Sequence, residues 1–200
     1  MCRFIETIRV ENGSICNLAY HVRRMNETRR AFWGDVPALD LEAVIPAENT
    51  AGRMKCRVEY GSGIGPVTIS PYRMRPVASL SLVEDDTLDY VFKYADRSGL
   101  DRLFERRGEA DDILLVRGGL LTDTSIANLA LFDGSRWVTP ACPLLRGTKR
   151  QELLDKGVIR EEAVPSSSLG RFTQIALFNA LIDFGELVLP VTSHTIWQDF

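Results

Sequence analysis

Residues 91–97 read Val91-Phe92-Lys93-Tyr94-Ala95-Asp96-Arg97. Lys93 is one of four lysines in the chain. An aliphatic and aromatic run around a single Lys predicts a strand that carries its ammonium group into an interior. Burial lowers the pKa of a Lys amine and makes the amine a usable nucleophile. Taken alone, the segment favours a Lys at a strand end whose ammonium group reaches water, since most lysines are solvated.

The composition is that of a soluble globular protein. The chain has 200 residues, 45% hydrophobic and 26% charged, enough for one large domain or two small ones. Its net charge of -3 argues against nucleic acid as a general partner. No apolar run approaches the roughly 18 residues of a membrane span. The start does not resemble a secretory signal, and the four cysteines are scattered, so we expect a cytoplasmic protein without a membrane partner. With only His21 and His194, a His-based metal site is not expected.

The first part of the chain predicts a sheet with one helix. Strands are expected at residues 3–10, 53–60 and 66–72, with a hairpin turn at Asn12-Gly13. Asn17 is placed to cap a helix over residues 18–33, whose apolar stripe consists of Leu18, Val22, Met25 and Phe32. Arg24 shares a helix face with His21, so it is either an anion clamp or a surface charge. Pro71 and Pro76 predict a linker at residues 74–84, which gives an N-terminal domain of residues 1–80 and a C-terminal domain of residues 81–200.

The second part predicts closely turned β-structure. Strands are expected at residues 113–116, 120–123, 127–132, 137–139 and 187–191, with Asp123 at the end of one of them. Residues 158–171 are predicted to be loop, and residues 172–181 fit helix or strand. Ser98 and Thr148 each have the spacing of a capping box at the start of a helix. The helix start at Gly147-Thr148-Lys149 would offer backbone N–H groups to an anion, although an ordinary capped helix fits the same residues.

These features occur in the order of a known family. The matching motifs are Phe4–Val10 with Asn12-Gly13, His21-x-x-Arg24-Met25, Lys93-x-x-Asp96-Arg97, Thr122-Asp123-Thr124-Ser125-x-x-Asn128-Leu129, Thr139-Pro140, Leu145-x-Gly147-Thr148-Lys149-Arg150, and Asn179-Ala180 before Pro190-Val191. Through them the chain resembles the class IV aminotransferases, which include branched-chain and D-amino-acid aminotransferases and aminodeoxychorismate lyase. The resemblance implies an α+β, two-domain, D-amino-acid-aminotransferase-like fold with a small N-terminal α+β domain and a C-terminal pseudo-barrel. It also implies a homodimer and the cofactor pyridoxal 5'-phosphate.

The resemblance also implies a role for each matched residue. Lys93 would form the Schiff base and later move the proton between the substrate Cα and the cofactor C4'. Arg24 would bind the phosphate, as would the chain at Thr148 and Lys149. Asp123 would face the pyridine nitrogen, because a cofactor of this kind needs a carboxylate there to stay protonated. Leu145 would pack on the ring.

The chain departs from the family pattern at several points. The pyridine partner is usually Glu and here is Asp123, which is one methylene shorter. Lys149 stands where Thr is more common, which puts a side-chain contact with the phosphate in doubt. Ser98 replaces a Tyr of the aminotransferases, and the chain begins after the family's first strands, which leaves the substrate pocket unpredicted.

Taken together, the sequence predicts a pyridoxal-phosphate enzyme. The favoured activity is that of 4-amino-4-deoxychorismate lyase, which releases 4-aminobenzoate and pyruvate in folate synthesis. The alternative is a branched-chain or D-amino-acid transaminase, and a non-catalytic binding protein of the same fold is a third. Arg3, Arg73 and Arg75 are candidates for gripping a substrate carboxylate, although each also fits a surface position.

Overall fold

The structure is a computed structural model that describes residues 3–48 and 50–197. The chain forms two compact units. Residues 1–74 together with 92–96 make the first unit, and residues 75–91 together with 97–200 make the second. Within the described ranges, no helix combines the length and the apolar character needed to cross a membrane.

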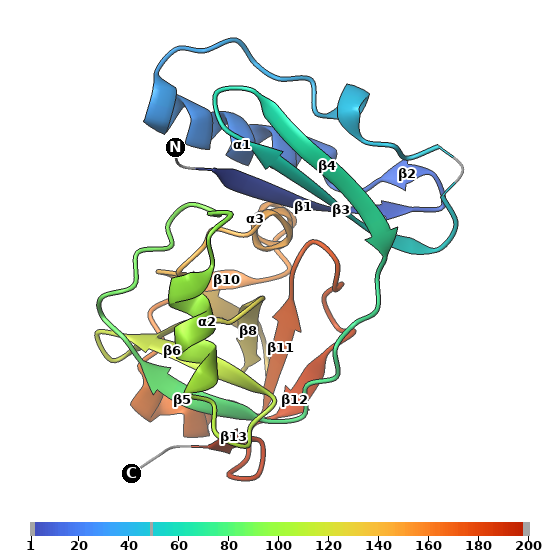
Figure 1. Cartoon of the computed structure of the whole chain (residues 1–200). Coiled ribbons are helices and arrows are strands. Elements are labelled where there is room, and N and C mark those ends of the chain that lie inside the picture. The colour runs from blue at the N-terminus through green and yellow to red at the C-terminus, as the bar shows by residue number, and fades with distance from the viewer. Residues whose placement is uncertain (1–2, 49, 198–200) are drawn as a thin grey trace. The chain divides into compact units, whose positions relative to one another are not determined.

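The first unit is a four-stranded antiparallel sheet with one long helix (Figure 1). Its strand order is β2-β1-β3-β4. The elements are β1 (Phe4–Glu11), β2 (Ser14–Ile15), α1 (Leu18–Trp33), the short 3-10 helix η1 (Glu42–Val44), β3 (Arg53–Tyr60) and β4 (Ile64–Pro71). Alternate residues of β1 face the core, so Phe4, Ile8 and Val10 are fully buried and belong to one core cluster with Met25 of α1.

The helix over residues 18–33 is confirmed, but its predicted side-chain cap is wrong. Asn17 makes no side-chain capping bond, and its φ of 59° is left-handed. A capping side chain needs an extended backbone at this position, whereas Asn17 makes the turn that leads from β2 into α1. Phe32 faces the core as predicted, since its ring centre lies 4.7 Å from that of the buried Phe4, but the side chain stays 40% exposed.

The second unit contains two sheets. One has the order β13-β5-β6-β7 and the other the order β10-β9-β8-β11-β12. The first consists of β5 (Leu80–Glu84), β6 (Asp112–Arg117), β7 (Leu120–Thr124) and β13 (Ile196–Trp197). The second consists of β8 (Asn128–Phe132), β9 (Trp137–Pro140), β10 (Arg160–Glu162), β11 (Gln174–Phe178) and β12 (Val188–Pro190). The helices are α2 (Ser98–Glu105), α3 (Thr148–Asp155) and the 3-10 helix η2 (Ser166–Arg171).

Several local predictions in this unit are wrong. The expected linker at residues 74–84 contains strand β5, which lies between β13 and β6 and pairs in parallel with both. The predicted loop at 158–171 contains β10 and η2. The capping boxes are also absent. The cap positions are Arg97, which makes no side-chain capping bond, and Gly147, which has no side chain. Ser98 and Thr148 lie one residue further on, inside the first turn of their helices.

The segment around Lys93 is not the regular strand that was predicted. It meets β1 through a single bridge between Phe4 and Tyr94 and through two flanking backbone bonds. The N–H of Ile5 donates to the Lys93 carbonyl at 2.9 Å, and that of Ala95 donates to the Arg3 carbonyl at 2.9 Å. The rings of Phe92 and Tyr94 pack around Phe4, with ring centres 6.1 and 5.1 Å from it. These contacts hold Lys93 half-buried against the edge of the sheet.

Candidate active site

The first unit holds a cluster of Glu6, His21, Arg24 and Lys93, which we name the Lys93 cluster. Glu6 projects from the core face of β1 and is fully buried. His21 and Arg24 reach it from α1, since residues three apart share a helix face. The Arg24 Nε donates to Glu6 Oε1 at 2.9 Å and Nη2 donates to Oε2 at 2.5 Å, while His21 Nδ1 lies 2.6 Å from Oε2. Lys93 is near enough for its charge to lower the pKa of His21.

The second unit holds a cluster around Asp123, which we name the Asp123 cluster. Asp123 lies in β7 and is 4% exposed. Its Oδ1 accepts a hydrogen bond from the Asn128 amide at 2.7 Å, and its Oδ2 accepts one from the Leu145 N–H at 2.8 Å. The tight turn between β7 and β8 brings Asp123 and Asn128 together, because the Thr124 N–H bonds the Ala127 carbonyl.

Burial is the main influence on the ionisation of Asp123. It raises the pKa of this carboxyl to about 6, although the Leu145 N–H, the Asn128 amide and the charge of Arg150 act in the opposite direction. A buried carboxylate is costly, and a cation placed directly beside it would relieve that cost. A protonated pyridine nitrogen is such a cation.

Gly147 provides close backbone approach at the start of α3. A Cβ at this position would lie 1.9 Å from Asn128 Oδ1. The same Asn128 amide donates to the Leu145 carbonyl at 2.9 Å. Asn128 therefore ties Asp123 to the segment that precedes α3, and this segment can pass Asn128 because residue 147 has no side chain. The sequence motif contained Asn128 without indicating this role.

The Gly147→Ala substitution is expected to destabilise the protein by about 1–3 kcal/mol, because the added methyl group displaces Asn128 from Asp123 and Leu145. The Gly147 backbone, with φ -69° and ψ 147°, is accessible to any residue. The expected loss therefore comes from the lack of room for the methyl group and not from backbone strain. Urea unfolding of the cofactor-free protein measures the effect. Gly170→Ala is the matched control, since a Cβ there meets nothing within 4 Å. Equal stability of the two variants would contradict this account.

The start of α3 offers backbone rather than side-chain contacts. Thr148 is 4% exposed. The Lys149 ammonium group pairs with Glu152 at 2.9 Å and with Asp183 at 3.1 Å. Burial lowers the pKa of Lys149, but these two carboxylates outweigh it and the net shift is upward. Two carboxylates thus compete with any anion for Lys149, whereas the first N–H groups of a helix have no intrahelical partner.

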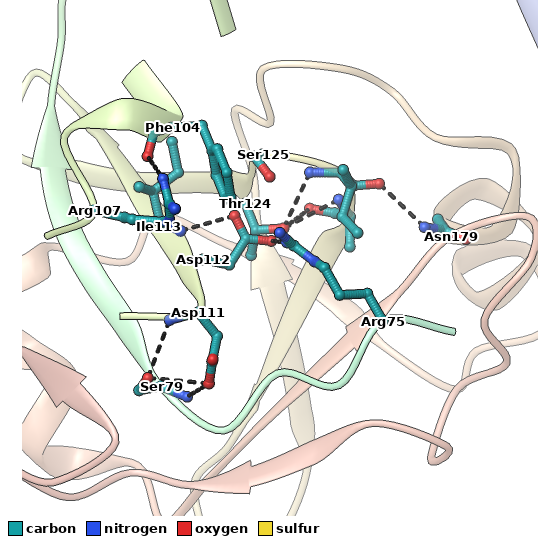
Figure 2. Close-up of polar contacts among 12 residues, drawn as sticks. Arg75, Ser79, Phe104, Arg107, Asp111, Asp112, Ile113, Thr124, Ser125 and Asn179 are labelled. Atoms are coloured by element: carbon teal, nitrogen blue, oxygen red, sulfur yellow. Dashed lines mark hydrogen bonds and ion pairs between the residues drawn. The ribbon is translucent and has the colours of Figure 1, made fainter. Parts of the chain in front are cut away.

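Two arginines that were candidates for a substrate carboxylate pair with acids of the protein instead. Figure 2 shows Arg75 reaching the buried Asp112, with Nη2 2.8 Å from Oδ2. The Arg75 guanidinium group also lies 5.0 Å from the centre of the Phe104 ring. Arg3 makes a longer contact of 3.4 Å with Glu59, while Arg73 is exposed. Arg75 thus serves to hold the start of the second unit to β6.

The Lys93 cluster and the Asp123 cluster contain the kinds of chemical group that pyridoxal 5'-phosphate requires. The Lys93 cluster supplies an amine and an arginine, and the Asp123 cluster supplies a buried carboxylate, a close backbone approach at Gly147 and a helix start. Pyridoxal-phosphate enzymes need an amine for the aldehyde, donors for the phosphate and an acid for the ring nitrogen. Glu6 and Asn128 lie within the matched motifs but were not among the predicted site residues, and they hold Arg24 and Asp123 in place.

The chain belongs to the amino-transferase class IV family, whose family model matches residues 91–193. It is accordingly an enzyme of the aminotransferase or lyase type, as the resemblance of its motifs implied, and the predicted α+β fold of this family is confirmed.

Two relatives by sequence cover different shares of the chain. An uncharacterized protein of Haemophilus influenzae is 33% identical over 187 residues, which make up 90% of this chain and 98% of that protein. A protein of Schizosaccharomyces pombe described as a putative aminodeoxychorismate lyase is 35% identical over 78 residues, which cover 36% of this chain and 34% of that protein.

Solved structures confirm the fold. A putative 4-amino-4-deoxychorismate lyase from Haemophilus somnus matches with a TM-score of 0.87 and 29% identity over 92% of this chain and 98% of its own. A putative amino-acid aminotransferase from Mesorhizobium loti matches over 100% of both chains with a TM-score of 0.81 and 20% identity. A hypothetical aminotransferase from Mycobacterium tuberculosis in a PLP-bound form matches with a TM-score of 0.78 and 19% identity, over 98% of this chain and 81% of that one.

Proposed function

We propose that this enzyme is a pyridoxal-phosphate-dependent lyase that converts 4-amino-4-deoxychorismate to 4-aminobenzoate and pyruvate. The observation that carries the cofactor assignment is Asp123, a buried carboxylate whose pKa is raised to about 6 by burial. Family membership supports the cofactor, and the likeness to the Haemophilus somnus protein over 98% of that chain supports the substrate. Ser98, where the aminotransferases have Tyr, also favours the lyase.

The cofactor, when bound, supplies an electron sink for the bond that breaks at the substrate Cα. Lys93 would supply the amine that takes up the cofactor aldehyde, and would then be the base that takes the proton released from the substrate Cα. Arg24 binds the phosphate, together with the backbone N–H groups of Thr148 and Lys149. Asp123 would keep the ring nitrogen protonated, and Leu145 would pack against the ring. These are the roles that the matched motifs imply.

We further infer, from the family, that the enzyme acts as a homodimer in the cytoplasm and serves folate synthesis. The contacts of Lys149 with Glu152 and Asp183 favour backbone over side-chain binding of the phosphate at α3.

Incubation with 4-amino-4-deoxychorismate, without any added 2-oxo acid, is expected to release pyruvate and 4-aminobenzoate in equal amounts. A lyase ends its reaction by releasing the new keto acid, so it needs no amino acceptor. Pyruvate is measured with lactate dehydrogenase and 4-aminobenzoate by its fluorescence. The Lys93→Ala variant, prepared in the same way, is the control.

The alternative reactions predict different results. Turnover that requires 2-oxoglutarate would overturn the lyase assignment and support a transaminase, for which branched-chain and D-amino acids are the substrates to test. Absence of turnover with either class, in a protein that binds the cofactor, would support a non-catalytic relative.

A further inference from the structure

Glu6 is a charged residue in a row of buried side chains on β1 that are otherwise apolar. It lies on β1 between Phe4 and Ile8 on the core-facing row, and all three side chains are fully buried. A carboxylate is expensive at such a place unless its charge and its lone pairs are satisfied. We therefore expect Glu6 to have a functional role that depends on its carboxylate group.

The contacts of Glu6 satisfy both of its oxygens. Arg24 donates to Oε1 and Oε2 through Nε and Nη2, a side-on pair that fixes the plane of the guanidinium group. Burial alone would raise the pKa of Glu6, but the charge of Arg24 and the hydrogen bond from His21 outweigh it and lower this pKa to about 2. Glu6 is thus ionised at neutral pH and acts as an acceptor in both contacts.

An ionised Glu6 determines the tautomer of His21. His21 is fully buried, and its Nδ1 lies 2.6 Å from Glu6 Oε2, so Nδ1 carries the proton. Burial lowers the pKa of His21, Glu6 raises it, and Arg24 and Lys93 lower it further, with a net downward shift. The ring is neutral at neutral pH, and Nε2 is a hydrogen-bond acceptor within the field of Lys93.

We infer that Glu6 is a positioning residue, which orients the Arg24 guanidinium group toward the cofactor phosphate and holds His21 as the Nδ1–H tautomer. This inference rests on the proposed function, because it assumes that Arg24 binds the phosphate. It adds to that function a reason for the acid at position 6. Without the carboxylate, Arg24 keeps its charge but loses the two hydrogen bonds with Glu6 that fix the plane of its guanidinium group.

Binding of pyridoxal 5'-phosphate and of pyridoxal to the cofactor-free protein tests the orientation of Arg24. Glu6→Gln is expected to weaken binding of pyridoxal 5'-phosphate by about tenfold or more, as loss of a charge-assisted contact does, and to leave pyridoxal binding nearly unchanged. Arg24→Ala is expected to do the same. The double variant is expected to lose little beyond either single one, because both changes remove one contact. Glu11→Gln makes the same change on the same strand, where Glu11 pairs with Arg9 and Arg53, and is expected to have no effect.

The outcomes separate this inference from the proposed function. If Arg24→Ala weakens the binding of pyridoxal 5'-phosphate and of pyridoxal equally, the assignment of Arg24 to the phosphate is wrong. If Arg24→Ala is selective for the phosphate and Glu6→Gln is not, or if the losses of the two single variants add in the double variant, the role of Glu6 is overturned while the proposed function stands.

The tautomer of His21 is measurable without cofactor and without altering Glu6. The chain has two histidines, and His194→Gln leaves His21 as the single one. Because His194 is exposed, this change is expected to leave the fold intact. Nitrogen-15 NMR of this cofactor-free variant is expected to show that, at neutral pH, Nδ1 of His21 carries a proton and Nε2 does not. An Nε2–H tautomer or a charged ring would overturn the inference even if Glu6→Gln fails to fold.

Discussion

Lys93→Ala is expected to abolish the covalent attachment of the cofactor and to lower turnover by at least about a thousandfold, since both a nucleophile and a proton carrier are removed. The purified variant is expected to lack the visible absorbance of the wild-type protein. Treatment with borohydride followed by mass spectrometry is expected to find the cofactor fixed to the wild-type peptide that contains Lys93 and absent from the variant.

Lys149→Ala is the matched control for this experiment. The Lys149 ammonium group is held by Glu152 and Asp183, so its removal is expected to leave the reducible adduct in place. An adduct that survives Lys93→Ala and disappears in Lys149→Ala would show that the nucleophile has been assigned to the wrong lysine.

Asp123→Asn is expected to lower turnover by about 10²–10³-fold, because an amide cannot provide the negative charge that a protonated ring nitrogen needs. Breaking a buried charge pair costs about 3–5 kcal/mol, which corresponds to rate losses of this order or larger. Steady-state kinetics with saturating cofactor measure the loss. Asp155→Asn, an identical change at the exposed end of α3, is expected to retain wild-type turnover.

The same variant has a consequence for stability that needs no cofactor. The folded pKa of Asp123, about 6, lies above its ordinary value of 3.8, so the folded protein holds this proton more tightly than the unfolded chain. The contribution of Asp123 to the free energy of unfolding is therefore greatest below about pH 4 and declines as the pH rises through about 6. Wild type is expected to lose about 2 kcal/mol relative to Asp123→Asn between about pH 4 and pH 7. A constant difference between the two proteins over this range would contradict a raised pKa.

The sequence indicated elements whose determinants are local and missed those that depend on distant partners. The hairpin signal at Asn12-Gly13 and the apolar stripe of α1 are contained in short windows, and both elements are present. Strand β5 was mistaken for a linker because its neighbours are β6 and β13, the latter more than a hundred residues further along the chain. The capping boxes failed because one residue of difference in the helix start moves a hydroxyl from the cap into the first turn.

The candidate site follows the same division. Arg24, Lys93 and Asp123 could be proposed because each residue type matches a motif with a known order. The acid at position 6 stood in a strand pattern without a visible partner, although an acid on the core-facing row is itself a signal. Its partners His21 and Arg24 become evident only when α1 packs on β1. A glycine at position 147 already indicated close backbone approach before the helix, but its neighbour Asn128 becomes evident only when the two segments pack together.

Residues 92–96 belong to the first unit although residues 75–91, which precede them, belong to the second. This arrangement affects the order in which the protein can be completed as it leaves the ribosome. The last strand of the first sheet, β4, ends at Pro71, yet Phe92 and Tyr94, which pack against Phe4, emerge some twenty residues later. A polypeptide that stops at residue 80 has the whole sheet but neither those aromatic rings nor Lys93. Any continuous fragment that contains the whole first unit therefore also carries residues 75–91, and a fragment limited to that unit requires a designed connection from residue 74 to residue 92.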